Sequence, residues 1–277
     1  MPVIPIHALE DPRVAPYRNL KDRELAAQGG LFLAEGEHLV RRLLASGLRT
    51  HSLLVAQRVL DRVVPITPDQ VPIYVVSDAL MTGIMGFKFH SGLMAAGVRP
   101  DRPTIGSVME SATRPGQHAG VTLLVCPQVI NHDNLGALIR IAAAFGVDAM
   151  LLGERSCDPY WRRSVRVSMG AIFTLPVIRS SDIAADLQRL RDDWQVELIA
   201  TVTDADAQPL SQARRPSLPG APDRLAILVG SESQGLSADH IAMCQRRVTI
   251  PMHLGTDSLN IAVATAVMLF HFCTRPG

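Results

Sequence analysis

Three stretches in the C-terminal half hold polar side chains that could carry out chemistry together. Residues 134–140 open a predicted helix, residues 230–236 follow an apolar strand, and residues 250–260 precede the last predicted helix. Strand ends and helix starts are the places where open α/β sheets build their sites. We therefore expect the three stretches to form the walls of one pocket, whose candidate catalytic residues are Asn134, Arg140, Glu232, Ser258 and Asn260.

Each stretch, taken alone, also has an ordinary structural explanation. Asn134 and Ser258 are both candidate N-caps, because a short polar side chain can accept a hydrogen bond from the first turn of a helix. Arg140 follows Asn134 by about 600° of helical rotation, so helix geometry alone does not place the two side chains on one face. The loop Gly-Ser-Glu-Ser-Gln-Gly-Leu at 230–236 lacks the G-x-G-x-x-G spacing of a dinucleotide site.

Composition excludes several classes of protein. The chain has 277 residues, of which 47% are hydrophobic and 19% are charged, so it has enough apolar residues for packed cores. Its net charge of +1 does not by itself indicate a nucleic-acid partner. The four cysteines are widely separated, so we expect reduced thiols and no metal site. We expect no signal peptide and a cytoplasmic protein, and the last apolar helix is too short to span a membrane.

The order of predicted elements indicates two α/β domains. A proline-rich and polar segment at 104–119 predicts a linker between residues 1–103 and residues 120–277. In the first domain, strands are predicted at 51–56, 73–76 and 93–98. In the second domain, strands alternate with helices, which predicts a mostly parallel sheet with helices on both faces. One of these helices is expected at 183–193, with Asp182 as its N-cap.

In the order and spacing of its three polar stretches, the C-terminal half resembles the SpoU/TrmH class of RNA ribose 2′-O-methyltransferases in the SPOUT superfamily. The resemblance implies S-adenosylmethionine as cofactor and a deep trefoil knot, whereas ordinary threading rules predict an unknotted sheet. Residues 21–24, 32–36 and 88–95 also resemble the RNA substrate-binding domain that precedes such catalytic domains, a small α/β fold shared with ribosomal proteins.

The resemblance assigns roles to individual residues. It places Arg140, Asn134, Glu232, Ser258 and Asn260 at the reaction centre. Arg140 could act as the base or as an electrostatic stabiliser of the developing alkoxide, and the second role is favoured because arginine is normally a poor base. Glu232 could position Arg140 or hold the substrate ribose. The family often has a serine where this chain has Ala262. The residues implied to bind the cofactor are Val229, Gly230, Gly235, Ile250, Met252, Ser258 and Leu259.

A basic and aromatic segment at 154–166 is a candidate RNA contact. Arg155, Arg162, Arg163 and Arg166 lie near Tyr160 and Trp161 in the sequence, a combination that suits RNA, although a solvated arginine-rich face is the simpler explanation. The resemblance further implies a homodimer and favours rRNA over tRNA as substrate. Two alternatives remain open, a non-catalytic RNA-binding protein on the same fold and a nucleotide-cofactor enzyme with another small molecule.

Overall fold

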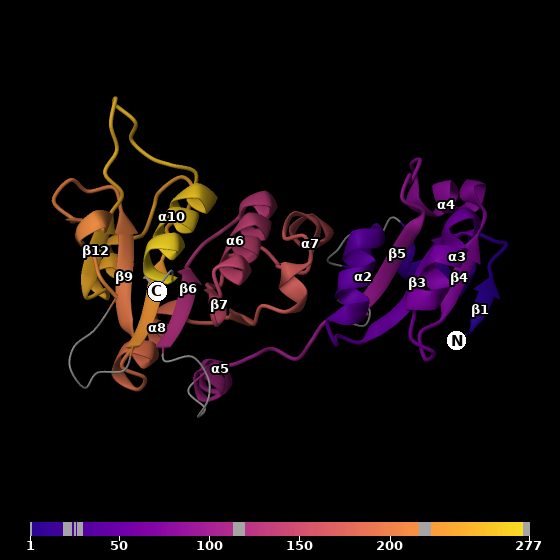
Figure 1. Ribbon diagram of the computed structural model, residues 1–277, viewed down its shortest axis with the longest axis horizontal. Coiled ribbons are helices and arrows are strands. Elements are labelled where there is room, and N and C mark those ends of the chain that lie inside the picture. The colour runs from indigo at the N-terminus through magenta and orange to yellow at the C-terminus, as the bar shows by residue number, and fades with distance from the viewer. Residues whose placement is uncertain are drawn as a thin grey trace. The chain divides into compact units, whose positions relative to one another are not determined.

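The computed structural model describes residues 2–18, 24, 26, 30–112, 120–215 and 223–273, which form two compact units. The first unit comprises Met1–Asp101 with Pro159–Thr174, and the second comprises Arg102–Asp158 with Leu175–Gly277. The predicted substrate-domain residues 21–23 and the linker residues 113–119 lie outside the described residues. Each unit has its own sheet (Figure 1).

The first unit is built on a mixed five-stranded sheet of order β1-β4-β3-β5-β2. Strand β5 pairs antiparallel with β2 and β3, while β1, β4 and β3 run parallel. The strands predicted at 51–56, 73–76 and 93–98 are confirmed. The strands are β1 (Val3–Pro5), β2 (Leu31–Glu35), β3 (Thr50–Ala56), β4 (Ile73–Val76) and β5 (Leu93–Val98). The helices are η1 (Pro12–Tyr17), α2 (Glu37–Ala45), η2 (Gln57–Val59), α3 (Leu60–Val63), η3 (Val64–Ile66), α4 (Asp78–Met85), α7 (Arg162–Val167) and η4 (Ala171–Phe173).

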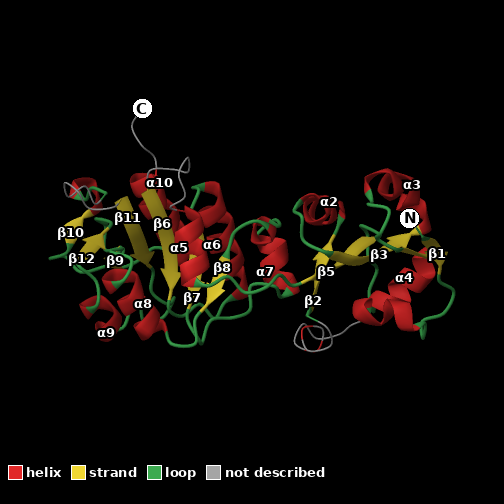
Figure 2. Ribbon diagram, turned by 90° about the horizontal axis from the view of Figure 1, so that it is seen from below, coloured by secondary structure: helices red, strands yellow, loops and turns green. Residues whose placement is uncertain are grey.

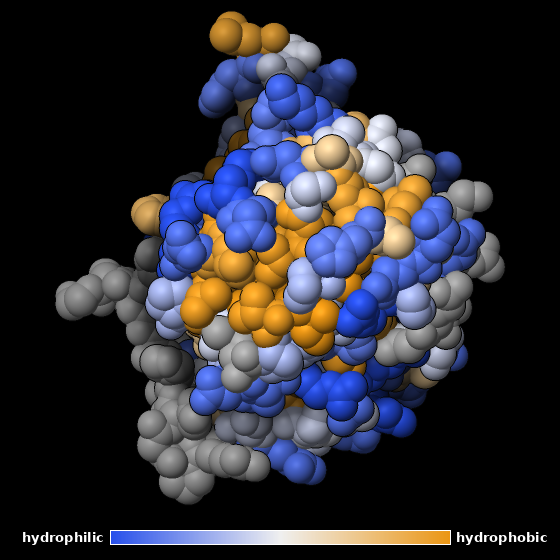
Figure 3. All heavy atoms as spheres, turned by 90° about the vertical axis from the view of Figure 1, so that its right-hand side faces the viewer, coloured by the Kyte–Doolittle hydropathy of each residue, from blue (hydrophilic) through white to orange (hydrophobic). Residues whose placement is uncertain are grey.

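Apolar side chains also reach the surface of this unit. Figure 3 faces the side on which the edge strand β1 lies, and it shows hydrophobic side chains gathered there within a polar surround. The exposed large hydrophobic residues of the unit include Val3 of β1 and Leu9, which follows that strand. The core itself is closed by fully buried side chains such as Leu53, Leu54 and Ile73.

The segment Pro159–Thr174 is part of the first unit because its aromatic rings pack on Phe32 of β2. The centroids of the Tyr160 and Phe173 rings lie 5.1 Å and 5.6 Å from that of Phe32. The Arg99 guanidinium lies 5.4 Å from the Tyr160 centroid on the ring face. Phe32 is buried, and a Cβ on Gly97 would lie 2.4 Å from its ring. Position 97 of the neighbouring strand β5 therefore has to be glycine. The sequence predicts a second domain at 120–277, which includes this segment, whereas the structure places the segment in the first unit.

The second unit contains a seven-stranded, fully parallel sheet of order β10-β12-β9-β11-β6-β7-β8. The predicted N-cap Asp182 is confirmed, since its Oδ1 accepts a hydrogen bond from the Ala185 amide at 3.0 Å. The strands are β6 (Gly120–Cys126), β7 (Ala149–Leu152), β8 (Val177–Arg179), β9 (Glu197–Val202), β10 (Gln208–Pro209), β11 (Asp223–Leu228) and β12 (Arg246–Thr249). The helices are α5 (Ile105–Ala112), α6 (His132–Ala144), α8 (Ile183–Asp192), η5 (Leu210–Gln212), α9 (Ala238–Ala242) and α10 (Ile261–Cys273).

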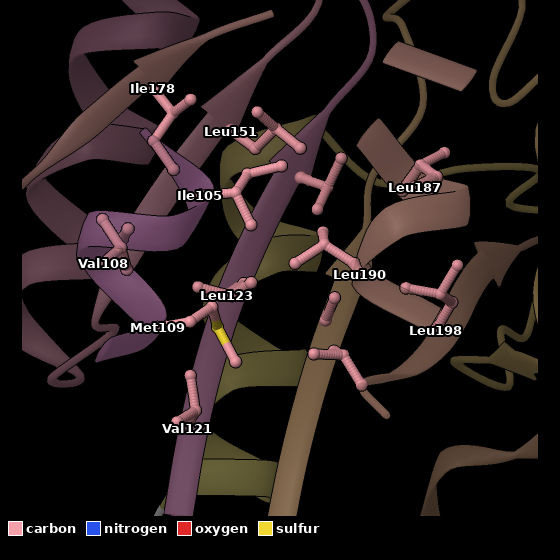
Figure 4. Close-up of a cluster of buried hydrophobic side chains, with 14 of the residues drawn as sticks. Ile105, Val108, Met109, Val121, Leu123, Leu151, Ile178, Leu187, Leu190 and Leu198 are labelled. Atoms are coloured by element: carbon pink, nitrogen blue, oxygen red, sulfur yellow. The ribbon is translucent and has the colours of Figure 1, made fainter. Parts of the chain in front are cut away.

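Helices cover both faces of this sheet, as the sequence predicts. Figure 2 shows α10 on one side of the strands and α8 on the other. On the α8 side, alternate strand residues such as Val121 and Leu123 form a buried cluster with α8 and α5. Figure 4 shows Ile105 and Met109 of α5 pointing into this cluster. Helix α5 therefore packs in the core of the second unit, although the sequence predicts a linker at 104–119.

Helix α10 packs in the second unit, where Met268, Leu269 and Phe272 are buried. Arg215 anchors its end by donating a hydrogen bond to the Phe272 carbonyl oxygen at 3.1 Å, and it also pairs with Asp223 at 2.7 Å. No helix in the described parts of the chain combines the length and the apolar character that crossing a membrane requires.

Candidate active site

The side chains of Asn134, Glu232 and Asn260 form one hydrogen-bonded set. Nδ2 of Asn134 donates to Oε1 of Glu232 at 2.9 Å, and Nδ2 of Asn260 donates to Oδ1 of Asn134 at 3.3 Å. The three residues are separated by 98 and 126 positions in the chain. The fold therefore brings together one residue from each of the three polar stretches, as predicted.

Asn134 is available for this set because another residue caps its helix. The predicted N-cap at Asn134 is wrong: Oδ1 of Asn131 accepts from the amides of Asp133 and Asn134, at 2.8 Å and 3.2 Å. Asn134 thus lies in the first turn of α6, and both ends of its amide point to other elements. In the N-cap position, the side-chain oxygen would instead accept hydrogen bonds from the first amides of the helix.

The last helix shows the same kind of correction. The predicted N-cap Ser258 is wrong, because α10 begins at Ile261 and Oδ1 of Asn260 accepts from the Ala262 amide at 2.9 Å. Asn260 uses its oxygen for the cap and its Nδ2 for Asn134, so one side chain both starts the helix and joins the polar set. Ala262, the departure from the family pattern, is buried at the start of α10.

A tight loop presents Glu232 at the end of β11. The backbones of Ser231 and Gly235 exchange two hydrogen bonds of 3.0 Å, which closes the loop on itself. A Cβ on Gly230 would lie 2.2 Å from the Gly235 carbonyl carbon, so no larger residue fits there without moving the backbone. The glycines of this motif are thus explained by the shape of the loop that carries the carboxylate.

A small pocket is lined in part by Ser258 and Leu259, which directly precede Asn260 of this set in the chain. Of the predicted cofactor residues, Ile250, Met252, Ser258 and Leu259 line it, while Val229, Gly230 and Gly235 are not among its lining residues. The other lining residues are Thr201, Val202, Thr203, Ala264 and Met268. Thr201 and Thr203 were not predicted as site residues. Their signal in the sequence is the appearance of polar side chains where the apolar strand β9 ends. Open parallel sheets bind ligands at the carboxyl ends of their strands.

The pocket is apolar with a few hydroxyl groups, which suits a nucleoside. Its volume of about 90 Å³ is below the roughly 300–1,000 Å³ of ligand pockets. Two of its lining residues, Ser258 and Leu259, belong to the exposed segment 253–260. In this segment Leu254 is fully exposed and has a φ of 58°.

Arg140 lies outside the hydrogen-bonded set. Its side chain is exposed on α6, and within the described residues it forms no hydrogen bond or ion pair. Glu232 bonds to Asn134 and not to Arg140, so a positioning role of Glu232 toward Arg140 has no contact to support it in this chain. The rotation of about 600° between positions 134 and 140 accounts for the separation.

The four predicted RNA-binding arginines differ in their surroundings. Arg155 is exposed in the second unit. Arg162 begins α7, and its guanidinium lies 3.8 Å from the Glu35 carboxylate, with 28% of its side chain exposed. Arg163 and Arg166 of the same helix are exposed. The aromatic neighbour Tyr160 packs on Phe32, so it is not open for base stacking.

Burial raises the pKa of two cysteine thiols in the second unit. Burial raises the pKa of the Cys126 thiol, and the Glu232 carboxylate raises it further. Burial also raises the pKa of Cys157 to about 11, so both thiols are protonated near neutral pH and are poor nucleophiles. All four cysteines are free. No group of three or more potential metal ligands occurs among the described residues.

Comparisons with known proteins agree with this geometry. The model of the SpoU rRNA Methylase family matches residues 122–270, and that of the MRM3-like substrate binding domain matches residues 11–95. A Mycobacterium tuberculosis protein named as a tRNA/rRNA methyltransferase is 34% identical, over 97% of this chain and 90% of its own length. The Bacillus subtilis 23S rRNA (guanosine(2553)-2′-O)-methyltransferase RlmP is 26% identical, over 96% and 98%. The fold is that of an AdoMet-bound rRNA methyltransferase from Sinorhizobium meliloti, with a TM-score of 0.78, 24% identity and 97% coverage of both chains.

Proposed function

This chain belongs to the SpoU rRNA methylase family, and we propose that it methylates a ribose 2′-hydroxyl in rRNA, using S-adenosylmethionine. The observation that carries the proposal is the hydrogen-bonded set of Asn134, Glu232 and Asn260. Asn260 directly follows the pocket residues Ser258 and Leu259 in the chain. The set joins the three stretches on which the family resemblance rests.

The pocket residues fit the cofactor by their chemistry. Ile250, Met252 and Leu259 offer apolar contacts for the adenine, and the hydroxyl of Ser258 offers a hydrogen bond. When bound, S-adenosylmethionine supplies an electrophilic methyl group. The loop 230–236 adds backbone groups at the end of β11, the strand next to β9 in the sheet.

The polar set orients the substrate ribose. One oxygen of Glu232 accepts from Asn134, and within the described residues the carboxylate has no other hydrogen-bond donor. Its second oxygen is therefore suited to accept the hydrogen bond of a ribose hydroxyl, and we favour this role over the positioning of Arg140. As the hydroxyl oxygen attacks the methyl group, its proton passes along this hydrogen bond to the Glu232 carboxylate, which is exposed and can release it to solvent. The guanidinium of Arg140 would then stabilise the developing alkoxide through its charge, because a guanidinium group is a poor base.

Ribosomal RNA is favoured over tRNA as the substrate, and the cytoplasm as the place of action. A relative of nearly the same length is named for 23S rRNA, and the first unit matches a substrate-binding domain. Mapping of 2′-O-methyl groups in RNA from cells with and without the gene tests this directly. Loss of one rRNA methylation in the deletion strain is expected. Loss of a tRNA methylation instead would reassign the substrate.

A homodimer is supported by an apolar stripe on α10. Val263, Val267 and Phe270 follow one another at helical spacing and are 51%, 38% and 61% exposed. A second copy of the chain would bury these side chains in a symmetric contact. We expect Val267→Glu to halve the mass measured by sedimentation, whereas Leu9→Glu in the first unit leaves it unchanged. A wild-type protein that sediments as a monomer would contradict the dimer.

A further inference from the structure

An exposed aromatic ring lies on the loop between α4 and β5. We call Gly86–Gly92 the aromatic loop; its sequence is Gly-Phe-Lys-Phe-His-Ser-Gly. The side chain of Phe87 is 54% exposed, more than that of any other large hydrophobic residue described in the first unit. Phe87 therefore adds little to the core, and an exposed ring on a loop is a ready contact for a partner.

A second ring holds Phe87 in place. The ring centroids of Phe87 and Phe89 lie 6.2 Å apart with an interplanar angle of 78°, an edge-to-face arrangement. Phe89 is the less exposed of the two. The contact fixes the orientation of the Phe87 ring while much of its surface stays open to solvent.

Both ends of the aromatic loop are anchored. The Gly86 amide donates to the Thr82 carbonyl at 2.9 Å, which ends α4. Arg58 donates from Nη2 to the His90 carbonyl at 2.7 Å and from Nε to Asp78 at 2.9 Å. A Cβ on Gly92 would lie 2.8 Å from Nη2 of Arg58, so glycine makes room for this clamp. An anchored loop loses less conformational entropy when it binds.

The charge at the aromatic loop is positive. Lys88 stands between the two rings in the sequence and is one of only two lysines in the chain. It is exposed, and among the described residues it forms no hydrogen bond or ion pair. The Arg58 guanidinium at the base of the loop is paired with Asp78 at 2.9 Å, so the uncompensated positive charge is that of Lys88. An aromatic ring beside a free cation is the combination that binds single-stranded nucleic acid, because bases stack on the ring and phosphates pair with the cation.

We propose that the aromatic loop binds an unpaired nucleotide of the RNA substrate, with its base stacked on Phe87 and its phosphate paired with Lys88. The inference rests on the proposed function, since that function supplies RNA as the ligand. It goes beyond that function by assigning a nucleotide-binding site in the first unit, separate from the polar set of Asn134, Glu232 and Asn260.

The test is binding of the full-length protein to an unstructured single-stranded RNA oligonucleotide, measured by fluorescence anisotropy at several salt concentrations. Phe87→Ala should raise Kd between about 5-fold and about 150-fold, the equivalents of about 1 and 3 kcal/mol for one stacked base. Phe87→Tyr should bind like wild type, and Phe87→Leu should resemble the alanine variant. Lys88→Ala should reduce the slope of log K against log salt by about 0.7, the value for one phosphate.

Two controls separate stacking from other causes. Leu9→Ala removes another exposed apolar side chain of the first unit and should leave Kd unchanged. A fully paired RNA duplex offers no free base, so Phe87→Ala should not weaken its binding. Equal losses for single-stranded and duplex RNA, or full affinity in Phe87→Leu, would overturn the stacking site.

The proposal can fail independently of the proposed function. If the wild type binds RNA and methylates it while Phe87→Ala does both equally well, the aromatic loop is not a binding site and the methyltransferase assignment stands. If the wild type neither binds nor methylates RNA, the proposed function fails first. S-adenosylmethionine affinity should be the same in the wild type and in Phe87→Ala.

Discussion

At the scale of single residues, the orientation of the Asn134 amide is fixed from both ends. Its nitrogen donates to Glu232 and its oxygen accepts from Asn260, so rotating the amide by half a turn would lose both hydrogen bonds. The carboxylate of Glu232 is held in turn by this contact. The geometry therefore depends on the amide chemistry of Asn134 and not merely on its size.

The first prediction concerns Asn134→Asp. The substitution keeps the shape of the side chain but places a carboxylate at hydrogen-bonding distance from Glu232, so two like charges face each other. We expect kcat to fall by about 10²-fold or more, the usual loss for one preorganised donor. S-adenosylmethionine affinity, measured by calorimetry, should stay within a few-fold.

Asn131→Ala is the matched control for this prediction. It removes the cap of the same helix and should cost about 1 kcal/mol of unfolding free energy with little change in kcat. If Asn134→Asp turns over as fast as the wild type, the polar set is structural and has no part in catalysis.

The second prediction concerns Arg140, for which we expect a charge-stabilising role. Arg140→Ala should abolish methyl transfer while the affinity for S-adenosylmethionine changes by no more than a few-fold, because the exposed guanidinium does not line the pocket proposed to bind the cofactor. Arg140→Lys should recover part of the rate, since it restores the charge without the planar fork. Turnover in Arg140→Ala would remove this residue from the reaction.

The types of the site residues could be predicted from the sequence, but their local roles could not. Asn131 and Asn134 are both good caps by type, and only the path of the backbone decides which one starts α6. The same holds for Ser258 and Asn260 at α10. A hydrogen bond across 98 positions, as between Asn134 and Glu232, depends on the sheet order, which local patterns do not determine.

At the scale of elements, α7 presents its arginines in different ways. Arg162 is paired with Glu35, whereas Arg166 is exposed and, among the described residues, has no hydrogen bond or ion pair. Phosphate binding by this helix is therefore expected to depend more on the exposed Arg166 than on Arg162.

The third prediction follows from this difference. Arg166→Ala should reduce the slope of log K against log salt for RNA binding by about 0.7–0.9, the contribution of one phosphate contact. Arg162→Ala should change this slope less, because its charge is already compensated by Glu35. Equal slopes for the wild type and Arg166→Ala would show that α7 is an ordinary solvated surface.

The strands could be predicted because buried strands appear as apolar runs, and β4 begins and ends at the predicted residues Ile73 and Val76. Helix α5 could not. Prolines and polar residues flank it closely, so the composition around it is that of a linker. Its three core residues, Ile105, Val108 and Met109, gain their meaning only from the sheet face that they cover.

At the scale of the whole molecule, a segment from the C-terminal half of the chain completes the core of the first unit. The aromatic contacts of Tyr160 and Phe173 with Phe32 join residues more than 120 positions apart. A division of the sequence at one linker could not reveal this, because a run of basic and aromatic residues looks like a surface.

The fourth prediction is that Tyr160→Ala destabilises the first unit. It removes an aromatic pair with Phe32 and the cation–π contact with Arg99, which together contribute about 2 kcal/mol. Urea unfolding should show the loss in the transition assigned to the first unit. Phe87→Ala, at an exposed position of the same unit, should stay within about 0.5 kcal/mol of the wild type. Unchanged stability of Tyr160→Ala would mean that this segment does not support the core.

The central claim is that the polar set and its neighbouring pocket carry out methyl transfer to a ribose hydroxyl of rRNA. The most direct measurement incubates the purified protein with ribosomal RNA and S-adenosylmethionine labelled in its methyl group, digests the RNA to nucleosides and identifies the labelled product. We predict that the label appears in a single 2′-O-methylated nucleoside, and that Asn134→Asp largely removes it. A label on a base, or no transfer by the wild-type protein into any RNA, would contradict this claim.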